Sequence, residues 1–175
     1  ERLDSKYVTN GNWNFSNWST GSGRFNNRPD YIETAGESGT VAEISVVYTV
    51  LLTPDNKRIV IPNSHITTNH IINYSAENMR RVDFSFSISY SDNIERAKAV
   101  IKEVALANEN IFKDPLPEVY VNSHEASSIN LTARVWCKVD KYWEVYFAMQ
   151  ESVKIALDKN GICIPFNQLD VHIIN

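Results

Sequence analysis

Two of the four histidines, both cysteines and one pair of adjacent arginines stand out as residues whose types and spacing could support chemistry. His65 and His70 lie five positions apart, a spacing that suits neither one face of a helix nor a pair on one strand. A zinc site needs three or four convergent ligands. We therefore expect no metal ligand at this position and assign both histidines to a loop or an interface.

The two cysteines favour structural roles. Cys137 falls on the inward face of an expected strand, and Cys163 lies in another apolar stretch. We interpret both as buried, unreactive thiols rather than a redox pair. The two residues could be neighbours in one sheet, so the sequence leaves a disulfide between them open. Two cysteines are too few for a disulfide-stapled secreted scaffold.

No arrangement typical of an enzyme is present in the sequence. Gly36–Glu37–Ser38–Gly39 lacks the spacing of a nucleophile elbow and is better interpreted as a turn entering a strand. Gly21–Ser22–Gly23 lacks the third glycine and the preceding strand of a dinucleotide fingerprint. We therefore expect no catalytic residue, no cofactor-binding residue and no cofactor, and we do not expect an enzyme.

The composition is that of a folded protein without a membrane span. The chain has 175 residues, which suits one ordinary domain or two small ones, and 43% of them are hydrophobic. The net charge of −4 argues against a protein whose main task is to grip phosphate backbones. No stretch contains the roughly 20 mostly apolar residues of a spanning helix, and the N-terminus opens no signal peptide.

The organisation changes near residue 30. Asn, Ser, Gly and Thr supply more than half of residues 5–30, so we interpret residues 1–29 as an atypical polar segment, loop-like, tag-like or poorly ordered. Residues 30–78 show short strand patterns instead. Thr40–Leu52 and Lys57–Ile61 flank a turn at Thr53–Asn56, and a further short strand is expected near Ile71. This range predicts a small, strongly curved all-β unit.

Residues 79–175 alternate strand and helix patterns. A strand with one buried face is expected over Val82–Tyr90, followed by a helix for which Asp92 and Glu95 form a capping pair. The later elements are expected to be strands at Glu118–Asn122 and Ser127–Val139, a helix at Tyr142–Asn160 capped by Gly161, and a last strand at Val171–Ile174. The order β-α-β-β-α-β predicts a ferredoxin-like domain, and the whole chain is expected to be α+β.

Ordered motifs along the chain resemble one known family. Their order and spacing are similar to those of the small-conductance mechanosensitive channel (MscS) family over about residues 30–175. The motifs are Gly39–Thr40–Val41–Ala42–Glu43–Ile44, Ile61–Pro62–Asn63–Ser64, Asn73–Tyr74–Ser75, Arg80–Arg81–Val82–Asp83–Phe84, Ala126–Ser127–Ser128–Ile129–Asn130–Leu131 and Gly161–Ile162–Cys163–Ile164–Pro165–Phe166 with Gln168–Leu169–Asp170–Val171–His172.

The resemblance implies the fold and the function. It implies an Sm-like β domain over 30–78 and a mixed α/β vestibule domain over 79–175. It also implies a homo-oligomeric ring of seven under a pore in the bacterial inner membrane, with these domains in the cytoplasm. The channel would open under membrane tension and pass ions and small solutes during hypo-osmotic shock. The family's apolar pore helix would precede the β domain, but residues 5–28 are polar there. We therefore expect a fragment or altered chain carrying the soluble part of a channel.

Several residues are candidates for assembly. Trp136 lies on the outward face of the long strand, where either a helix or a neighbouring subunit could cover it. Leu169, Val171 and Ile173 belong to an apolar terminal stretch, and the resemblance implies that this stretch pairs with its counterparts around the ring axis.

The adjacent arginines leave one rival function open. Sm-like and ferredoxin-like modules can bind RNA, so Arg80 and Arg81 could belong to a soluble RNA-binding module. The long strand lacks the aromatic-rich signature that stacks bases, however, and Asp83 lies beside the arginines. We therefore expect no nucleic acid and interpret Arg80 and Arg81 as residues of a salt bridge at the domain junction.

Overall fold

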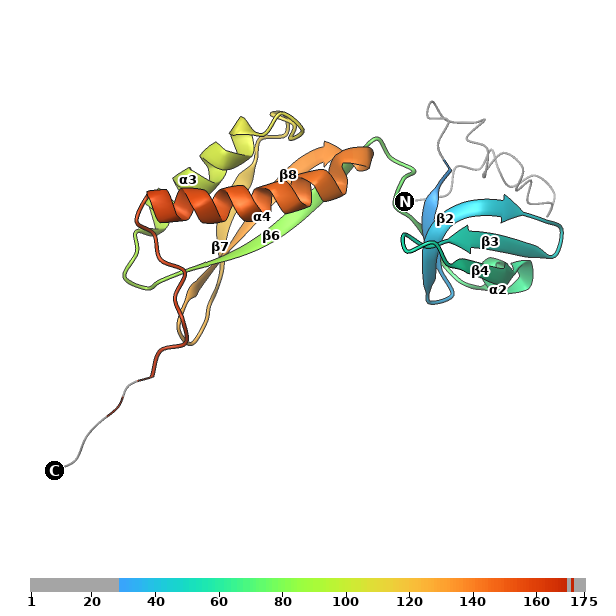
Figure 1. Cartoon of the computed structure of the whole chain (residues 1–175), viewed down its shortest axis with the longest axis horizontal. Helices are drawn as coiled ribbons and strands as arrows, with labels where there is room; N and C mark the ends of the chain where they lie inside the picture. The colour runs from blue at the N-terminus through green and yellow to red at the C-terminus, as the bar shows by residue number, and fades with distance from the viewer. Residues whose placement is uncertain (1–28, 170, 172–175) are drawn as a thin grey trace. The chain divides into compact units, whose positions relative to one another are not determined.

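The computed structural model describes residues 29–169 and 171, so the predicted polar segment lies almost wholly outside the described residues (Figure 1). The chain divides into two compact units between Glu77 and Asn78. Each unit has its own hydrophobic core.

The first unit is a five-stranded antiparallel sheet with one short helix. Its spatial strand order is β4-β3-β2-β1-β5. A bulge between Val41 and Glu43 interrupts the pairing of β2 with β3, and such a bulge bends a strand. The elements are β1 (Tyr31–Thr34), β2 (Glu37–Ile44), β3 (Tyr48–Leu52), β4 (Arg58–Pro62), α2 (Asn63–Thr68) and β5 (Ile71–Asn73).

The stretch Thr40–Leu52, with its strand-like composition, forms two strands rather than one. Ser45 turns the chain between them, because its hydroxyl accepts a hydrogen bond from the Tyr48 amide at 3.1 Å. The Asn63 side-chain amide donates to the carbonyl oxygens of Ser45 and Val46 at 2.9 and 3.1 Å. The side-chain oxygen Oδ1 of Asn63 in turn accepts from the Thr49 hydroxyl at 2.9 Å. A residue from the start of α2 therefore fixes this turn, and local composition does not reveal such a contact.

The turn expected at Thr53–Asn56 is confirmed. The Asn56 amide donates to the Thr53 carbonyl at 2.9 Å, and Asn56 adopts φ +66°. Gly39 lies where β2 passes close to β3, since a Cβ there would be 2.9 Å from the Leu52 carbonyl oxygen. The buried core of this small unit consists of Ile32, Val41, Leu51, Ile61 and Ile66.

The second unit places two helices on one face of a three-stranded antiparallel sheet (Figure 1). The spatial strand order is β6-β8-β7, so the longest pairings belong to the central strand β8. The elements are β6 (Met79–Ile88), α3 (Ile94–Ala107), β7 (Glu118–His124), β8 (Ile129–Lys138), the 3-10 turn η2 (Val139–Lys141) and α4 (Tyr142–Lys159). The predicted α+β class, an Sm-like β unit followed by a ferredoxin-like unit, is confirmed.

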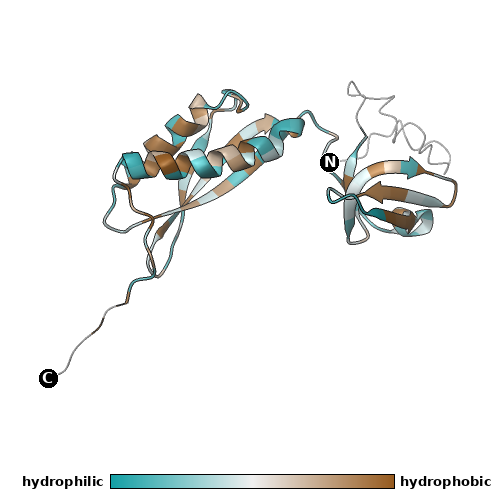
Figure 2. Cartoon of the chain, in the orientation of Figure 1, coloured by the Kyte–Doolittle hydropathy of each residue, from teal (hydrophilic) through white to brown (hydrophobic). Residues whose placement is uncertain are grey.

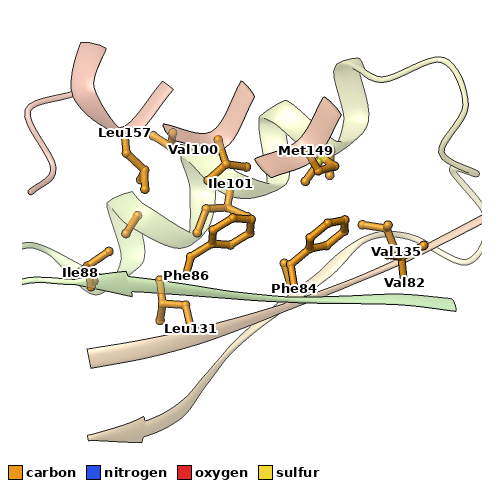
Figure 3. Packing of buried hydrophobic residues seen from close by; sticks show 14 of the residues in the cluster. Val82, Phe84, Phe86, Ile88, Val100, Ile101, Leu131, Val135, Met149 and Leu157 are labelled. Carbon is orange, nitrogen blue, oxygen red and sulfur yellow. The ribbon is translucent and has the colours of Figure 1, made fainter. Parts of the chain in front are cut away.

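Strict alternation along the strands builds the core of the second unit. Phe84 and Phe86 point from β6 toward the helices, where Ile101 of α3 and Met149 of α4 meet them (Figure 3). The intervening residues of β6 and β8 face the other side of the sheet. Along α4, hydrophobic and hydrophilic residues alternate in bands (Figure 2). Its buried residues are Val145, Met149, Val153 and Leu157.

The predicted capping pair of α3 is wrong. Asn93 caps the helix instead, because its side-chain oxygen accepts a hydrogen bond from the Arg96 amide at 2.9 Å. Asp92 lies one position too early to reach the first free amides of the helix. Its carboxylate contacts the chain after α4, as described below, and Glu95 pairs with Lys98.

The chain end after α4 is less regular than expected. Gly161 adopts φ +67°, which confirms the predicted left-handed cap. Residues 162–169 then run without regular secondary structure. Of the predicted strand Val171–Ile174, the structure describes only Val171, and it is not in a strand. Strand formation needs a partner for the backbone groups, and within the described residues no strand pairs with this stretch.

Candidate functional site

The histidines do not form a metal centre in the part of the chain that the structure describes. His65 lies on α2 and His70 follows that helix, and both are exposed. Among the described residues, no three His, Cys, Asp or Glu side chains gather closely enough to hold a metal ion.

The two cysteines have different environments and are not bridged. Cys137 is buried on β8, and burial raises the pKa of its thiol. Cys163 is exposed, which corrects the expectation that both thiols are buried. The difference arises because Cys163 lies beyond the end of α4, in a stretch without regular secondary structure whose residues are mostly exposed.

Arg80 and Arg81 follow Met79 at the start of β6 and make different contacts. Two nitrogens of the Arg81 guanidinium bind the two carboxylate oxygens of Asp83 at 2.7 and 2.9 Å, and this pairing raises the pKa of Arg81. The Arg80 guanidinium lies over the ring of Tyr142, 3.8 Å from its centroid. These contacts lie within the second unit, and a role of the arginines at the domain junction stays a prediction.

Trp136 lies on the face of the sheet opposite the helices. Its neighbours Val135 and Cys137 are fully buried toward the helices, while Trp136 is partly buried. Among the described residues of this unit, no helix covers the face that carries Trp136 (Figure 1). Arg81 is paired with Trp136 in the register of β6 and β8. The sequence left open whether a helix or a neighbouring subunit covers Trp136. Among the described residues of this unit no such helix is found, and the subunit contact stays a prediction.

The first turns of α4 carry an aromatic surface that sequence reasoning missed. Trp143 and Phe147 are 62% and 63% exposed, and their rings stack at 5.9 Å. Tyr146 lies beneath them and stacks on Phe84 at 5.6 Å. Aromatic residues four positions apart on one helix were the available signal. Large exposed aromatic pairs are typical of surfaces that another molecule covers.

The chain after α4 exposes a second apolar surface. Leu169 is 85% exposed and Val171 is 71% exposed, and Phe166 is exposed beside them. The third predicted contact residue of this stretch, Ile173, lies outside the described residues. In Figure 1 the chain leaves α4, passes the end of β6 and continues away from the sheet.

Main-chain and side-chain hydrogen bonds hold the first part of this terminal stretch. The Ser89 amide donates to the Cys163 carbonyl at 3.0 Å, and the Cys163 amide donates to Oδ2 of Asp92 at 2.8 Å. The Gln168 amide donates to the Ser127 hydroxyl at 3.0 Å. The chain is thereby attached first to the end of β6 and then to the turn between β7 and β8.

The helices among the described residues are short or carry charged side chains. None of the helices there is long and apolar enough to cross a bilayer.

Two models of protein families match most of the described residues. The model of the mechanosensitive ion channel beta-domain matches residues 27–76, and the model of the C-terminal region of the mechanosensitive ion channel MscS matches residues 82–164. The two matches follow one another in the expected order and together take in more than half of the chain. The chain belongs to the MscS family.

Individual relatives agree with the family models. The small-conductance mechanosensitive channel of Edwardsiella ictaluri is 40% identical over 144 residues, which are 82% of this chain and 50% of that protein. The small-conductance mechanosensitive channel of Helicobacter pylori is 35% identical over 147 residues, which are 83% of this chain and 54% of that protein. The chain thus spans about half the length of these MscS relatives.

A solved structure extends the similarity to three dimensions. The crystal structure of Helicobacter pylori MscS in the closed state is 34% identical, with a TM-score of 0.80, and covers 86% of this chain and 60% of that one. Arabidopsis thaliana MSL1, 24% identical with a TM-score of 0.66, shares the fold.

Proposed function

We propose that this chain is the soluble portion of one subunit of a mechanosensitive channel. The observation that carries the proposal is the succession of both MscS family matches along the chain, together with the TM-score of 0.80 to a closed MscS channel. The full-length protein would lie in the bacterial inner membrane, with the Sm-like and ferredoxin-like units in the cytoplasm. Membrane tension would open it, and ions and small solutes would leave the cell during hypo-osmotic shock.

The channel would be a homo-oligomeric ring of seven subunits. Two exposed apolar surfaces of the second unit support assembly. One is the aromatic surface of α4, formed by Trp143 and Phe147, and the other is the terminal stretch with Leu169 and Val171. Trp136 on the opposite sheet face and Ile173 further along are proposed to join these contacts. The ring would filter solutes by size and charge beneath the pore.

The comparisons favour the channel over the rival RNA-binding module. Arg81 is also occupied by Asp83 through two hydrogen bonds, which weakens its capacity to bind a phosphate. The function proposed here uses no covalent chemistry and no cofactor.

Electrical recording tests the proposed activity. The full-length protein that contains this chain is reconstituted into liposomes, and suction is applied to excised patches. We expect currents that appear only above a threshold suction, and protein-free liposomes should show none. Protein-containing patches that stay silent up to the tension that ruptures the bilayer would contradict the channel function. Mass photometry of the detergent-solubilised protein should show seven copies, and a strictly monomeric protein would contradict the ring.

A further inference from the structure

Two side chains attach the terminal stretch to the rest of its unit. Asp92 lies in the loop between β6 and α3, and Ser127 lies in the turn between β7 and β8. Asp92 accepts from the Cys163 amide at 2.8 Å, and Ser127 accepts from the Gln168 amide at 3.0 Å. The two acceptors are 71 and 41 positions from their donors, so both contacts depend on the tertiary fold.

Asp92 can contact the Cys163 amide because a different residue caps the N-terminus of α3. Asn93 supplies the cap of α3 through its bond to the Arg96 amide. The Asp92 carboxylate also accepts from the Ser89 amide at 3.3 Å, and the Asp92 amide donates to the Ser89 carbonyl at 3.1 Å. These bonds fix the loop at the end of β6 and aim the carboxylate at Cys163.

Packing contributes little to the position of the terminal stretch. Ile162 is buried, but from Cys163 to Leu169 every residue except Pro165 is exposed. A cavity of about 410 Å³ lies between this stretch and the end of the sheet, with Ser91, Ala126 and Phe166 in its lining. Because nearly all side chains of this stretch are exposed and bury little apolar surface, we infer that polar contacts decide where the chain runs.

We propose that Asp92 and Ser127 are positioning residues for assembly of the ring. They hold residues 163–168 against the end of the sheet, and they thereby fix the direction in which Leu169 and Val171 leave the unit. The partner is the same apolar stretch of further copies of this chain. This inference rests on the proposed ring, and it adds that the ring requires these two polar contacts made within each subunit.

Hydrogen exchange of the Cys163 amide in the 175-residue chain tests the Asp92 contact directly. Asp92→Ala should accelerate this exchange about tenfold, because a charged acceptor is lost. Asp92→Asn keeps an oxygen acceptor and should restore most of the protection. Glu95→Ala removes the same charge three positions away, from a side chain that is 82% exposed and bonded to Lys98, and should leave Cys163 unchanged. Unaltered exchange in Asp92→Ala would overturn the proposal.

Assembly of the full-length protein tests the consequence. The double variant Asp92→Ala, Ser127→Ala should shift mass photometry from rings toward smaller species, whereas Asp92→Asn, Ser127→Thr should assemble as the wild type does. Circular-dichroism spectra of the 175-residue chain should coincide for all variants, because both side chains lie outside the core, and coincident spectra show that a loss of rings is not a loss of the fold. Equally stable rings in the alanine variant and the wild type would overturn the proposal.

The two proposals fail in different ways. A wild-type protein that forms no ring contradicts the proposed function and the assembly role together. A wild-type ring that is indifferent to both alanine changes contradicts only the role of Asp92 and Ser127.

Discussion

The backbone amide of Cys163 lies 2.8 Å from a carboxylate oxygen of Asp92, and the Cys163 carbonyl accepts from the Ser89 amide at 3.0 Å. Cys163 is therefore placed beside the end of β6. This is the edge along which the last strand of a β-α-β-β-α-β unit is expected to run. In this chain the contact lasts for one residue, and the chain then continues as an irregular, exposed stretch.

Leu131 tests the core of the second unit. It lies on the central strand β8 and is fully buried between the sheet and the helices (Figure 3). Leu131→Ala should lower the free energy of unfolding by about 2–5 kcal/mol, because it removes buried apolar atoms and leaves a cavity. Urea unfolding followed by circular dichroism measures this change. Leu116→Ala, at an exposed position, should stay within about 0.5 kcal/mol, and equal losses for both would contradict the assigned core.

Gly39 tests the close approach of β2 to β3. A methyl group there would lie 2.9 Å from the Leu52 carbonyl oxygen, a backbone atom that cannot move aside without distorting the pairing. Gly39→Ala should destabilise the first unit by about 1–3 kcal/mol, the usual cost of overpacking.

The control for Gly39 lies on the same strand. Ala42 is exposed, and Ala42→Ser adds a similar volume that points into solvent. Thermal unfolding of the chain should separate the two variants clearly. An unchanged transition in Gly39→Ala would show that the strands are further apart than described.

The two thiols should react at very different rates. Cys163 is exposed, whereas Cys137 is buried and burial raises the pKa of its thiol. With iodoacetamide at about pH 8, mass spectrometry should find Cys163 labelled first and Cys137 labelled only when the protein unfolds. Cys163→Ser should abolish the fast phase, and rapid labelling of Cys137 in the folded protein would contradict its burial.

The first turn of α4 should show a small pH dependence. The Lys141 ammonium donates to Glu144 at 2.6 Å, and this hydrogen bond holds the pKa of Glu144 below its ordinary value. A lowered carboxyl pKa contributes stability above the unfolded pKa, and the contribution disappears as the pH falls through the folded pKa. Glu144→Gln should therefore be slightly less stable than the wild type near neutral pH and equal to it in strong acid.

Melting curves at a series of pH values measure this difference for Glu144. The effect must be small, because the side chains of Lys141 and Glu144 are both accessible to solvent, which screens their attraction. High salt should reduce it further by screening. A difference of constant size from neutral to acid pH would show that the ion pair is not its cause.

Periodicity and turn chemistry made most of the elements predictable. The alternation of β6 and β8 and the start of α4 at Tyr142 follow from residues close together in the chain. The turn at Thr53–Asn56 and the cap at Gly161 follow from the conformations that single residues tolerate. The Cys163 environment was predicted wrongly, because an apolar local sequence does not show where the covering helix ends.

The capping of α3 marks the limit of such local reasoning. Asp92 and Asn93 are adjacent, and both side chains are good caps, so residue type does not choose between them. The structure gives the cap to Asn93 and a long-range contact to Asp92. The α2 helix and its Asn63 contacts were missed for a similar reason, since Asn63 acts on a turn 17 and 18 positions earlier.

The sequence by itself determined the two-part α+β organisation, most helices and strands, and the membership of the MscS family, because each rests on local patterns or on ordered motifs. Only the tertiary structure decided which side chains are exposed together, as Trp143 and Phe147 are, and which polar groups meet, as Asp92 and Cys163 do. The physical reason is that exposure and long-range hydrogen bonds depend on how far each helix and strand extends over its neighbours. That extent is set by contacts between residues that are far apart in the sequence.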